Sequence, residues 1–185
     1  MTERTTRDQI VEAADQLFYR QGFEHTSFSD IAGAVRISRG NFYYYFRTKD
    51  EILDAVIEQR LADSRRMLER WENEGGTPKE RIRRFIDILI AHRADIKRYG
   101  CPLGTLNAQG EAKGLFSLFR GWLRRQFEQL GRKADADALA LHLLSLSQGV
   151  ATLANTFNDE KFIRREVQAM YDWLDACAEK STREE

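Results

Sequence analysis

Apolar residues recur at intervals of three and four positions along almost the whole chain. Within residues 6–21, for example, such positions are taken by Ile10, Ala13, Ala14, Leu17 and Phe18. This spacing places apolar side chains on one face of an α-helix, and no segment shows the polar–apolar alternation of a β-strand. With 185 residues, 42% of them hydrophobic, the chain is long enough to bury a core. We therefore predict an all-α protein.

Capping signals divide this pattern into about nine helices. A Ser or Thr followed three positions later by an acidic residue predicts a helix start at residues 27–30, 48–51 and 77–80. Glycines at 22, 75–76 and 131 predict helix ends. The expected helices cover 6–21, 28–35, 38–46, 49–74, 78 to the turn at 100–104, 105–109, 115–130, 135–157 and the segment after 159.

Several classes of protein are excluded. No apolar run has the ~18–20 residues of a membrane span, and the first residues lack the layout of a signal peptide. We therefore expect a cytoplasmic protein with no membrane partner. Cys101 and Cys177 form no CxxC or metal-ligand spacing, so we expect free thiols, no metal and no cofactor.

Residues 27–46 hold two short helices joined by about three residues, which is the spacing of a helix-turn-helix. The second helix, SRGNFYYYF, combines donors with aromatic rings. In a DNA major groove Arg bonds guanine and Asn bonds adenine, and tyrosine hydroxyls reach phosphates. Gly40 costs about 1 kcal/mol of helix stability relative to Ala, but its bare backbone permits close approach to DNA. The alternative is that the tyrosines are half-buried surface residues, while Phe42 and Phe46 pack inward.

The charge balance first argues against nucleic acid, because 29 basic residues are matched by 29 acidic residues. Residues 1–50 are also balanced, with seven of each sign. Residues 31–49, however, carry Arg36, Arg39, Arg47 and Lys49 and no acid. We therefore predict weak non-specific binding to DNA, and specific binding that depends on a dimer and a few placed contacts.

The stretch from Ile10 to Leu53 resembles the DNA-binding domain of the TetR family of transcriptional repressors. The matching segments are LFYRQGFEHTS, FSDIAGAV and SRGNFYYYFRTKDEIL. The resemblance implies a three-helix helix-turn-helix DNA-binding domain over 1–48 and a helical domain for ligand binding and dimerisation over 49–185. At Tyr45 many relatives carry His, and Tyr retains a hydrogen-bonding tip.

The resemblance also assigns residue roles in DNA binding. Thr26 or Ser27 would bind phosphate at the start of the second helix. Base edges would be faced by Ser38, Arg39, Gly40 and Asn41, and phosphates bound by Tyr43 and Tyr45. Tyr44 adds a further donor in the same run, and Lys49 would meet the DNA backbone. Arg47 is added on its charge and position.

In the second domain, the resemblance implies a homodimer and a small-molecule effector. The expected interface lies on the last two helices and comprises His142, Leu143, Leu146, Gly149, Val150, Leu153, Phe162, Val167, Met170, Trp173 and Leu174. The alternative for these residues is intrachain core. The expected effector pocket is aromatic, which suggests a hydrophobic or planar ligand, and is lined by Phe85, Leu89, His92, Phe116, Phe119 and Trp122.

Cys101 lies in the turn Gly-Cys-Pro-Leu-Gly, after Lys97 and Arg98, and such surroundings favour a thiolate. One hypothesis is therefore a repressor that senses oxidants or electrophiles through Cys101. The alternative is a small residue that fills a turn.

The leading interpretation is a ligand-responsive repressor that binds a palindromic double-stranded operator as a dimer. Two readily distinguished alternatives are a small helical enzyme and a helical protein-binding adaptor. The three histidines are scattered without HExxH spacing, and no phosphate-binding glycine loop is present, so we expect no enzyme activity. An adaptor leaves the sequence SRGNFYYYF unexplained.

Overall fold

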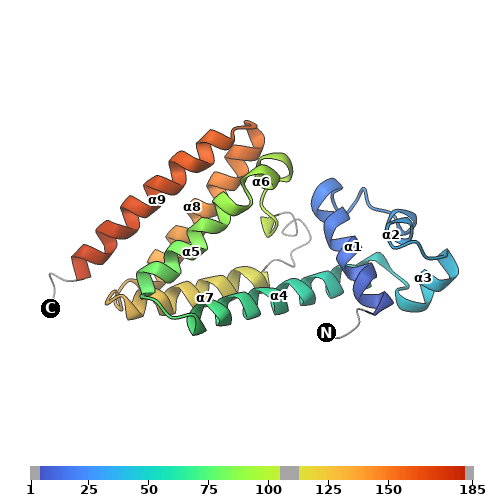
Figure 1. Ribbon diagram of the computed structural model, residues 1–185, viewed down its shortest axis with the longest axis horizontal. Helices are drawn as coiled ribbons and strands as arrows, with labels where there is room; N and C mark the ends of the chain where they lie inside the picture. The colour runs from blue at the N-terminus through green and yellow to red at the C-terminus, as the bar shows by residue number, and fades with distance from the viewer. Residues whose placement is uncertain (1–4, 105–112, 182–185) are drawn as a thin grey trace.

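The computed structural model describes residues 5–104 and 113–181, and these residues form nine α-helices (Figure 1). The helices are α1 (Thr6–Gln21), α2 (Phe28–Ala34), α3 (Arg39–Tyr45), α4 (Lys49–Asn73), α5 (Pro78–Ala91), α6 (Arg93–Tyr99), α7 (Lys113–Gln129), α8 (Ala136–Thr156) and α9 (Glu160–Ser181). The all-α prediction is confirmed. In the described part of the chain, no helix is long and apolar enough to cross a membrane.

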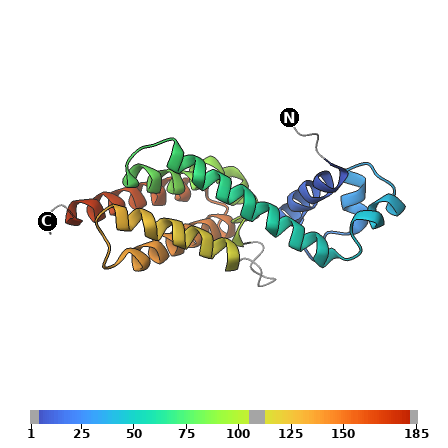
Figure 2. The same cartoon turned by 90° about the horizontal axis from the view of Figure 1, so that it is seen from below.

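Helices α1–α3 and the first turns of α4 form a small unit at one end of the molecule, which we call the head (Figures 1 and 2). The capping box predicted at Ser27 with Asp30 forms, and the structure adds one at Thr5 with Asp8 that the sequence analysis did not predict. Its core contains residues of all four helices, among them the fully buried Ile10, Ile31, Phe42 and Ile52. The head is therefore held by apolar packing of short helices that begin where the sequence predicts.

Helix α4 belongs to both parts of the molecule. Its N-terminal residues from Ile52 to Ile57 pack into the core of the head, and Leu68 packs into the core of the second domain. The core of the head therefore does not stop at the boundary predicted at residue 48. Figure 2 shows α4 running from the head along the second domain.

Helices α5–α9 and the C-terminal part of α4 form the second domain, which we call the effector-binding domain after the role that the sequence analysis predicts for it. Helices α7 and α8 pack side by side, as do α5 and α9. Its core is rich in large side chains such as Phe85, Phe127 and Ile163. Gln126 is fully buried among them and is satisfied by hydrogen bonds with Arg81 and Glu72. The buried side chains of this domain are thus mostly apolar, and the buried polar residues Gln126 and Ser147 both form hydrogen bonds.

One helix prediction is wrong. The expected continuous helix from 78 to the turn at 100–104 is broken at His92, where α5 ends and α6 begins with φ −106° and ψ 15°. The break allows Ile96 to become buried (2% exposed) as α6 packs against α8. Burial of this side chain is a tertiary effect that the helical periodicity does not contain. The short helix expected over 105–109 lies outside the described residues.

Candidate functional sites

Aromatic packing fixes the angle between α2 and α3. The ring of Phe28 on α2 lies 5.2 Å from that of Phe42 and 5.6 Å from that of Tyr43 on α3, measured between centroids. The turn between the helices includes Arg36 at φ 56°, in the left-handed region. Phe42 and Phe46 are buried, as predicted. The two helices therefore form the expected helix-turn-helix, with one face of α3 inside and the other outside.

The outward face of α3 carries the residues that the sequence assigns to base contacts. Ser38, Arg39, Gly40 and Asn41 are all exposed, and a Cβ added at Gly40 would meet no atom within 4 Å. Ser38 is also the helix cap, because its hydroxyl accepts the Asn41 backbone N–H at 3.2 Å. The Arg39 guanidinium donates to the hydroxyl of Ser29 on α2. A DNA groove can therefore approach this face closely.

The three tyrosines of α3 differ in exposure. Tyr44 is 82% exposed and Tyr43 is 51% exposed, whereas Tyr45 is half-buried with its ring 5.2 Å from that of Tyr44. Such large aromatic side chains are costly to leave in water unless they meet a partner. Tyr43 and Tyr44 are thus the side chains of α3 that project furthest toward an external partner.

Two of the residues predicted to contact the DNA backbone, Thr26 and Lys49, make contacts within the protein instead. Thr26 is only 2% exposed and its hydroxyl donates to the Gly22 carbonyl at 2.8 Å. The Lys49 ammonium donates to the Phe23 carbonyl at 2.7 Å and lies 4.2 Å from the centroid of the Phe23 ring. Arg47 is exposed. Of the two hydroxyls proposed at the start of α2, Ser27 is therefore the one that faces outward.

Ser27 and Asp30 form a reciprocal pair. The Ser27 hydroxyl donates to the Asp30 carboxylate at 2.7 Å and accepts the Asp30 backbone N–H at 3.2 Å. These hydrogen bonds from the Ser27 side chain and backbone hold the pKa of Asp30 below its ordinary value. This pair caps α2 and thereby fixes where the helix that packs against α3 begins.

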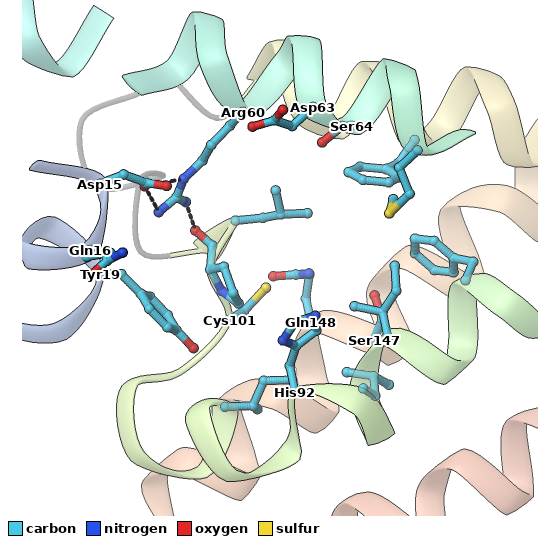
Figure 3. Close-up of a pocket in the computed structure, with 18 residues that line it drawn as sticks. Asp15, Gln16, Tyr19, Arg60, Asp63, Ser64, His92, Cys101, Ser147 and Gln148 are labelled. Carbon is cyan, nitrogen blue, oxygen red and sulfur yellow. Dashed lines mark hydrogen bonds and ion pairs between the residues drawn. The ribbon is translucent and has the colours of Figure 1, made fainter. Parts of the chain in front are cut away.

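A pocket of about 500 Å³ lies between the head and the effector-binding domain (Figure 3). Four of the six predicted pocket residues line it, namely Phe85, Leu89, His92 and Phe119. The other two lie elsewhere. Trp122 is buried in the domain core, with its ring 5.7 Å from that of Trp71, and Phe116 packs against the core of the head. Both follow the apolar periodicity of their helices. That periodicity predicts that a side chain is buried, but not whether it faces a cavity.

The pocket also has polar lining residues that sequence analysis missed. They come from α1, α4 and α8 and are Asp15, Gln16, Tyr19, Arg60, Asp63, Ser64, Ser147 and Gln148. The part formed by the α1 residues and Arg60, which we call the polar end, lies on the side of the pocket next to the head (Figure 3). The polar lining residues are far apart in the sequence, and the only local signal is the spacing of four that puts Asp15 with Tyr19, and Arg60 with Ser64, on one helix face. The pocket therefore combines an apolar wall with a polar end built by separate helices.

Within the polar end, Arg60 and Tyr19 are already engaged. The side chain of Arg60 is 12% exposed, and its Nε donates to the Asp15 carboxylate at 2.6 Å. A second guanidinium nitrogen donates to the Pro102 carbonyl. The Tyr19 hydroxyl donates to the Gly100 carbonyl at 2.9 Å, and burial raises the pKa of Tyr19 to about 12. Tyr19 thus remains a protonated donor at neutral pH.

Cys101 is half-buried and lines this pocket, whereas Cys177 is buried in the last helix, and neither forms a disulfide. Figure 3 shows the Cys101 sulfur between the polar end and the side chains of His92 and Gln148. Among the described residues, no three His, Cys, Asp or Glu side chains gather in a way that could hold a metal ion.

The predicted dimer residues divide into two groups. Five are buried within the protomer and belong to its own core, namely Leu143, Val150, Val167, Met170 and Leu174. The other six are exposed or half-buried: His142, Leu146, Gly149, Leu153, Phe162 and Trp173. The intrachain alternative thus holds for the first group. Leu141 (42% exposed) and Phe157 (72% exposed) are exposed apolar residues of this region that the sequence analysis omitted.

The exposed residues of α8 form one uncharged face. They recur at helical spacing as Ala138, Leu141, His142, Ser145, Gly149, Thr152, Leu153 and Thr156. Asp137 is the only Asp, Glu, Lys or Arg in this helix. The rings of His142 on α8 and Trp173 on α9 are 5.1 Å apart, so the face continues onto α9. An uncharged face of this length is typical of a surface that another protein covers.

The fold and the outward face of α3 define a helix-turn-helix DNA-binding protein with a separate helical domain. Residues 10–56 match the model of the family "Bacterial regulatory proteins, tetR family". The chain is 31% identical over 149 residues to an uncharacterized HTH-type transcriptional regulator in the lacX 3′ region of Lactococcus lactis subsp. lactis, a match that covers 80% of this chain and 75% of that protein. The chain therefore belongs to the TetR family of transcriptional regulators, which are not enzymes.

Solved structures show the same fold. A TetR transcriptional regulator from Legionella pneumophila superimposes with a TM-score of 0.81 at 26% identity, covering 95% of this chain and 98% of that one. The reduced form of Escherichia coli NemR superimposes with a TM-score of 0.77 at 19% identity, covering 89% and 94%. In sequence, the transcriptional repressor NemR of E. coli K12 is 29% identical over 107 residues, 57% of this chain and 50% of that protein.

Proposed function

We propose that the protein is a repressor that binds a palindromic operator as a homodimer and leaves it when a small apolar molecule enters the pocket. The observation that carries this proposal is the position of the pocket, since Asp15, Gln16 and Tyr19 of the head line it together with residues of the effector-binding domain. A ligand in such a cavity contacts both domains at once. Its binding energy can therefore act on the placement of the head.

On the DNA side, we assign direct base contacts to Arg39 and Asn41 on the exposed face of α3. Tyr43, Tyr44 and Tyr45, with Ser27 at the start of α2 and Arg47 after α3, are assigned to phosphates. Lys49 reaches a phosphate only by leaving the Phe23 carbonyl. Thr26 supports the loop from inside. Since phosphate contacts position the protein and base contacts specify the sequence, Arg39 and Asn41 set operator choice.

A dimer supplies a second head, which binds the second half-site of the operator. A two-fold axis through the uncharged face of α8 and the adjoining part of α9 pairs each face with its own copy, as a C2 interface requires. Gly149 and Ser145 permit close approach of two α8 helices, and Leu153 adds apolar area. Leu153→Glu places a charge in that interface, so the variant is expected to be monomeric by light scattering, while Ser117→Glu on the exposed surface of α7 stays dimeric.

The effector is assigned to small molecules with a large apolar body and a polar end. Phe85, Leu89 and Phe119 form the apolar wall, and the rings of Phe85 and Phe119 lie 5.7 Å apart. Groups that accept or donate hydrogen bonds also line the cavity, on Ser64, Gln148 and His92. A cavity of about 500 Å³ lies within the usual range for drug-sized ligands.

The decisive experiment selects bound duplexes from random-sequence DNA with the full chain and then screens small apolar molecules for release of the selected duplex. A palindromic duplex and at least one releasing compound are expected. Leu89→Trp fills the pocket and is expected to retain DNA binding while losing release. Ile57→Val, a conservative change in the head, should behave like the unchanged protein. Failure to select any duplex at low or moderate salt contradicts the proposal.

A second candidate function rests on Cys101. Its position on the pocket wall places a free thiol where an incoming oxidant or electrophile meets it. In this case the pocket guides a reactive molecule and the modified thiol causes release. Cys101→Ser retains DNA binding in either case. Release by hydrogen peroxide should disappear in Cys101→Ser and persist in Cys177→Ser. Unchanged release from Cys101→Ser would rule out this second function.

A further inference from the structure

The segment from Lys97 to Leu103, which we call the strap, is held by side chains of three different helices. The Lys97 carbonyl accepts from Asn155 Nδ2 of α8 at 3.0 Å. The Gly100 carbonyl accepts from the Tyr19 hydroxyl of α1 at 2.9 Å, and the Pro102 carbonyl accepts from the Arg60 guanidinium of α4. Three backbone carbonyls within six residues therefore depend on distant side chains for hydrogen bonds.

Two of these contacts join the strap to the head. Tyr19 belongs to α1, and its ring also packs edge-on against Tyr99 of the strap, with centroids 5.5 Å apart. Arg60 bonds the Asp15 carboxylate of α1 and the Pro102 carbonyl at the same time, so it bridges α1, α4 and the strap (Figure 3). The first helix of the head is thus attached to the effector-binding domain through this segment, in addition to its packing on α4.

The strap is also a wall of the pocket. Cys101, Pro102 and Leu103 line the cavity, and so do both of the side chains that hold the strap to α1. Gly100 has φ 85°, a conformation that suits glycine, so the chain turns sharply where Tyr19 bonds it. A molecule cannot enter the polar end without meeting the strap or the groups that hold it.

We propose that Tyr19 and Arg60 are coupling residues, whose hydrogen bonds to the strap hold the head in its DNA-binding position, and that an occupant of the pocket acts by displacing the strap. The inference rests on the proposed function and adds the route by which the pocket controls the head. Once the strap leaves α1, the head samples other positions relative to its partner. The fraction of dimers with correctly spaced heads falls, and the apparent affinity for the operator falls with it.

The test compares Tyr19→Phe with the unchanged chain, both carrying Cys177→Ala so that Cys101 is the single thiol. Tyr171→Phe is the matched control, because it removes another tyrosine hydroxyl bond between helices, from α9 to Asp87 of α5, far from the strap in sequence. Operator affinity is measured on a selected duplex before and after N-ethylmaleimide adds to Cys101, with one adduct confirmed by mass. Thermal unfolding verifies that each variant is folded.

Before alkylation, Tyr19→Phe is expected to weaken operator binding about fivefold per protomer, the change that one hydrogen bond of ordinary net strength produces. Alkylation should weaken operator binding by the unchanged protein at least as much as Tyr19→Phe does. After alkylation the two proteins should bind within about twofold of each other, because the strap has already left Tyr19.

Equal affinity of Tyr19→Phe and the unchanged chain before alkylation overturns the inference. So does a difference that survives alkylation undiminished, or an equal loss in Tyr171→Phe. If the unchanged chain selects no duplex at all, the proposed function itself has failed and the coupling falls with it. If the unchanged chain binds the duplex and responds to alkylation but Tyr19→Phe has no effect, only the coupling inference fails and the proposed function stands.

Discussion

The head and the effector-binding domain use their helices in opposite ways. In the head, short helices bury Phe42 and Phe46 inward and present Asn41 and Tyr44 outward, so the functional surface is the face left over from packing. In the effector-binding domain the proposed functional surface is a cavity, and its lining comes from six helices and the turn after α6. A surface made by one helix is local in sequence, whereas a cavity made by many helices is not.

The largest expected effect breaks the packing that the head depends on. Phe42 is 1% exposed and joins α2 to α3, so Phe42→Ala is expected to cost about 3–5 kcal/mol of stability and to abolish DNA binding. Chemical denaturation and gel shift measure the two effects. Phe119→Leu in the pocket wall is the counterpart in the other domain and should keep DNA binding. Normal DNA binding by Phe42→Ala would contradict the inward role of this residue.

The next effect concerns the outward face of α3. Asn41→Ala is expected to lose about 1–3 kcal/mol of discrimination at one base pair of each half-site, because a side-chain contact to a base edge is removed. Binding to a panel of operators with single base-pair changes measures it. The fold should be unaffected, since Asn41 is exposed and only its backbone N–H takes part in the cap. An unchanged preference at every base pair would exclude a base contact.

A smaller and different effect is expected from Arg47. Its exposed guanidinium is assigned to a phosphate, so Arg47→Ala should weaken binding to all sequences alike and reduce the slope of log affinity against log salt by about 1. Titrations at several salt concentrations, on an operator and on an unrelated duplex, measure it. Asn41→Ala serves as the contrast, with its salt slope unchanged. A sequence-dependent loss in Arg47→Ala would assign this residue to a base instead.

The smallest effect lies in the effector-binding domain and depends on pH. Hydrogen bonds from Lys79 and Arg83 lower the pKa of Asp175 below 3.8, joining α5 to α9. Because the folded pKa is the lower one, the stabilisation is complete above the unfolded pKa and is lost as the pH falls through the folded value. Asp175→Asn should reduce stability by less than about 1 kcal/mol at pH 7. The loss should therefore shrink as the pH falls through the folded pKa of Asp175.

Urea unfolding of Asp175→Asn at pH 7 and in acid provides the measurement, with Asp54→Asn on the exposed side of α4 as the matched control. A destabilisation of equal size at both pH values would mean that Asp175 acts through packing and not through its charge.

The contrast between a surface on one helix and a cavity lined by several helices explains how much of each site could be predicted from the sequence. The helix-turn-helix was predictable because capping boxes, the buried phenylalanines and the donors of α3 all lie within twenty residues. The pocket was only partly predictable. Phe85, Leu89 and Phe119 follow from the apolar face of their helices, but the same periodicity also selects Trp122, which packs against Trp71 in the core. Helical periodicity predicts that a residue is buried, but it does not predict whether that residue faces a cavity.

The dimer face shows the same limit. Leu143 and Leu153 both belong to the apolar pattern of α8, yet Leu143 is fully buried within the protomer and Leu153 is 44% exposed. A helix buried on one side by its own chain and available to a second copy on the other is apolar on both sides. Only the packing of α6, α7 and α9 against α8 decides which side is which.

By itself, the sequence determined the helical class, most helix boundaries and the outward chemistry of α3, because these depend on residues within a few turns of one another. Tertiary structure alone decided the break at His92, the polar end of the pocket and the attachment of the strap to α1. Tyr19 and Gly100 are 81 positions apart, and Arg60 and Pro102 are 42 apart. Contacts over such distances arise from the way the helices pack, and no local pattern of residue types records them.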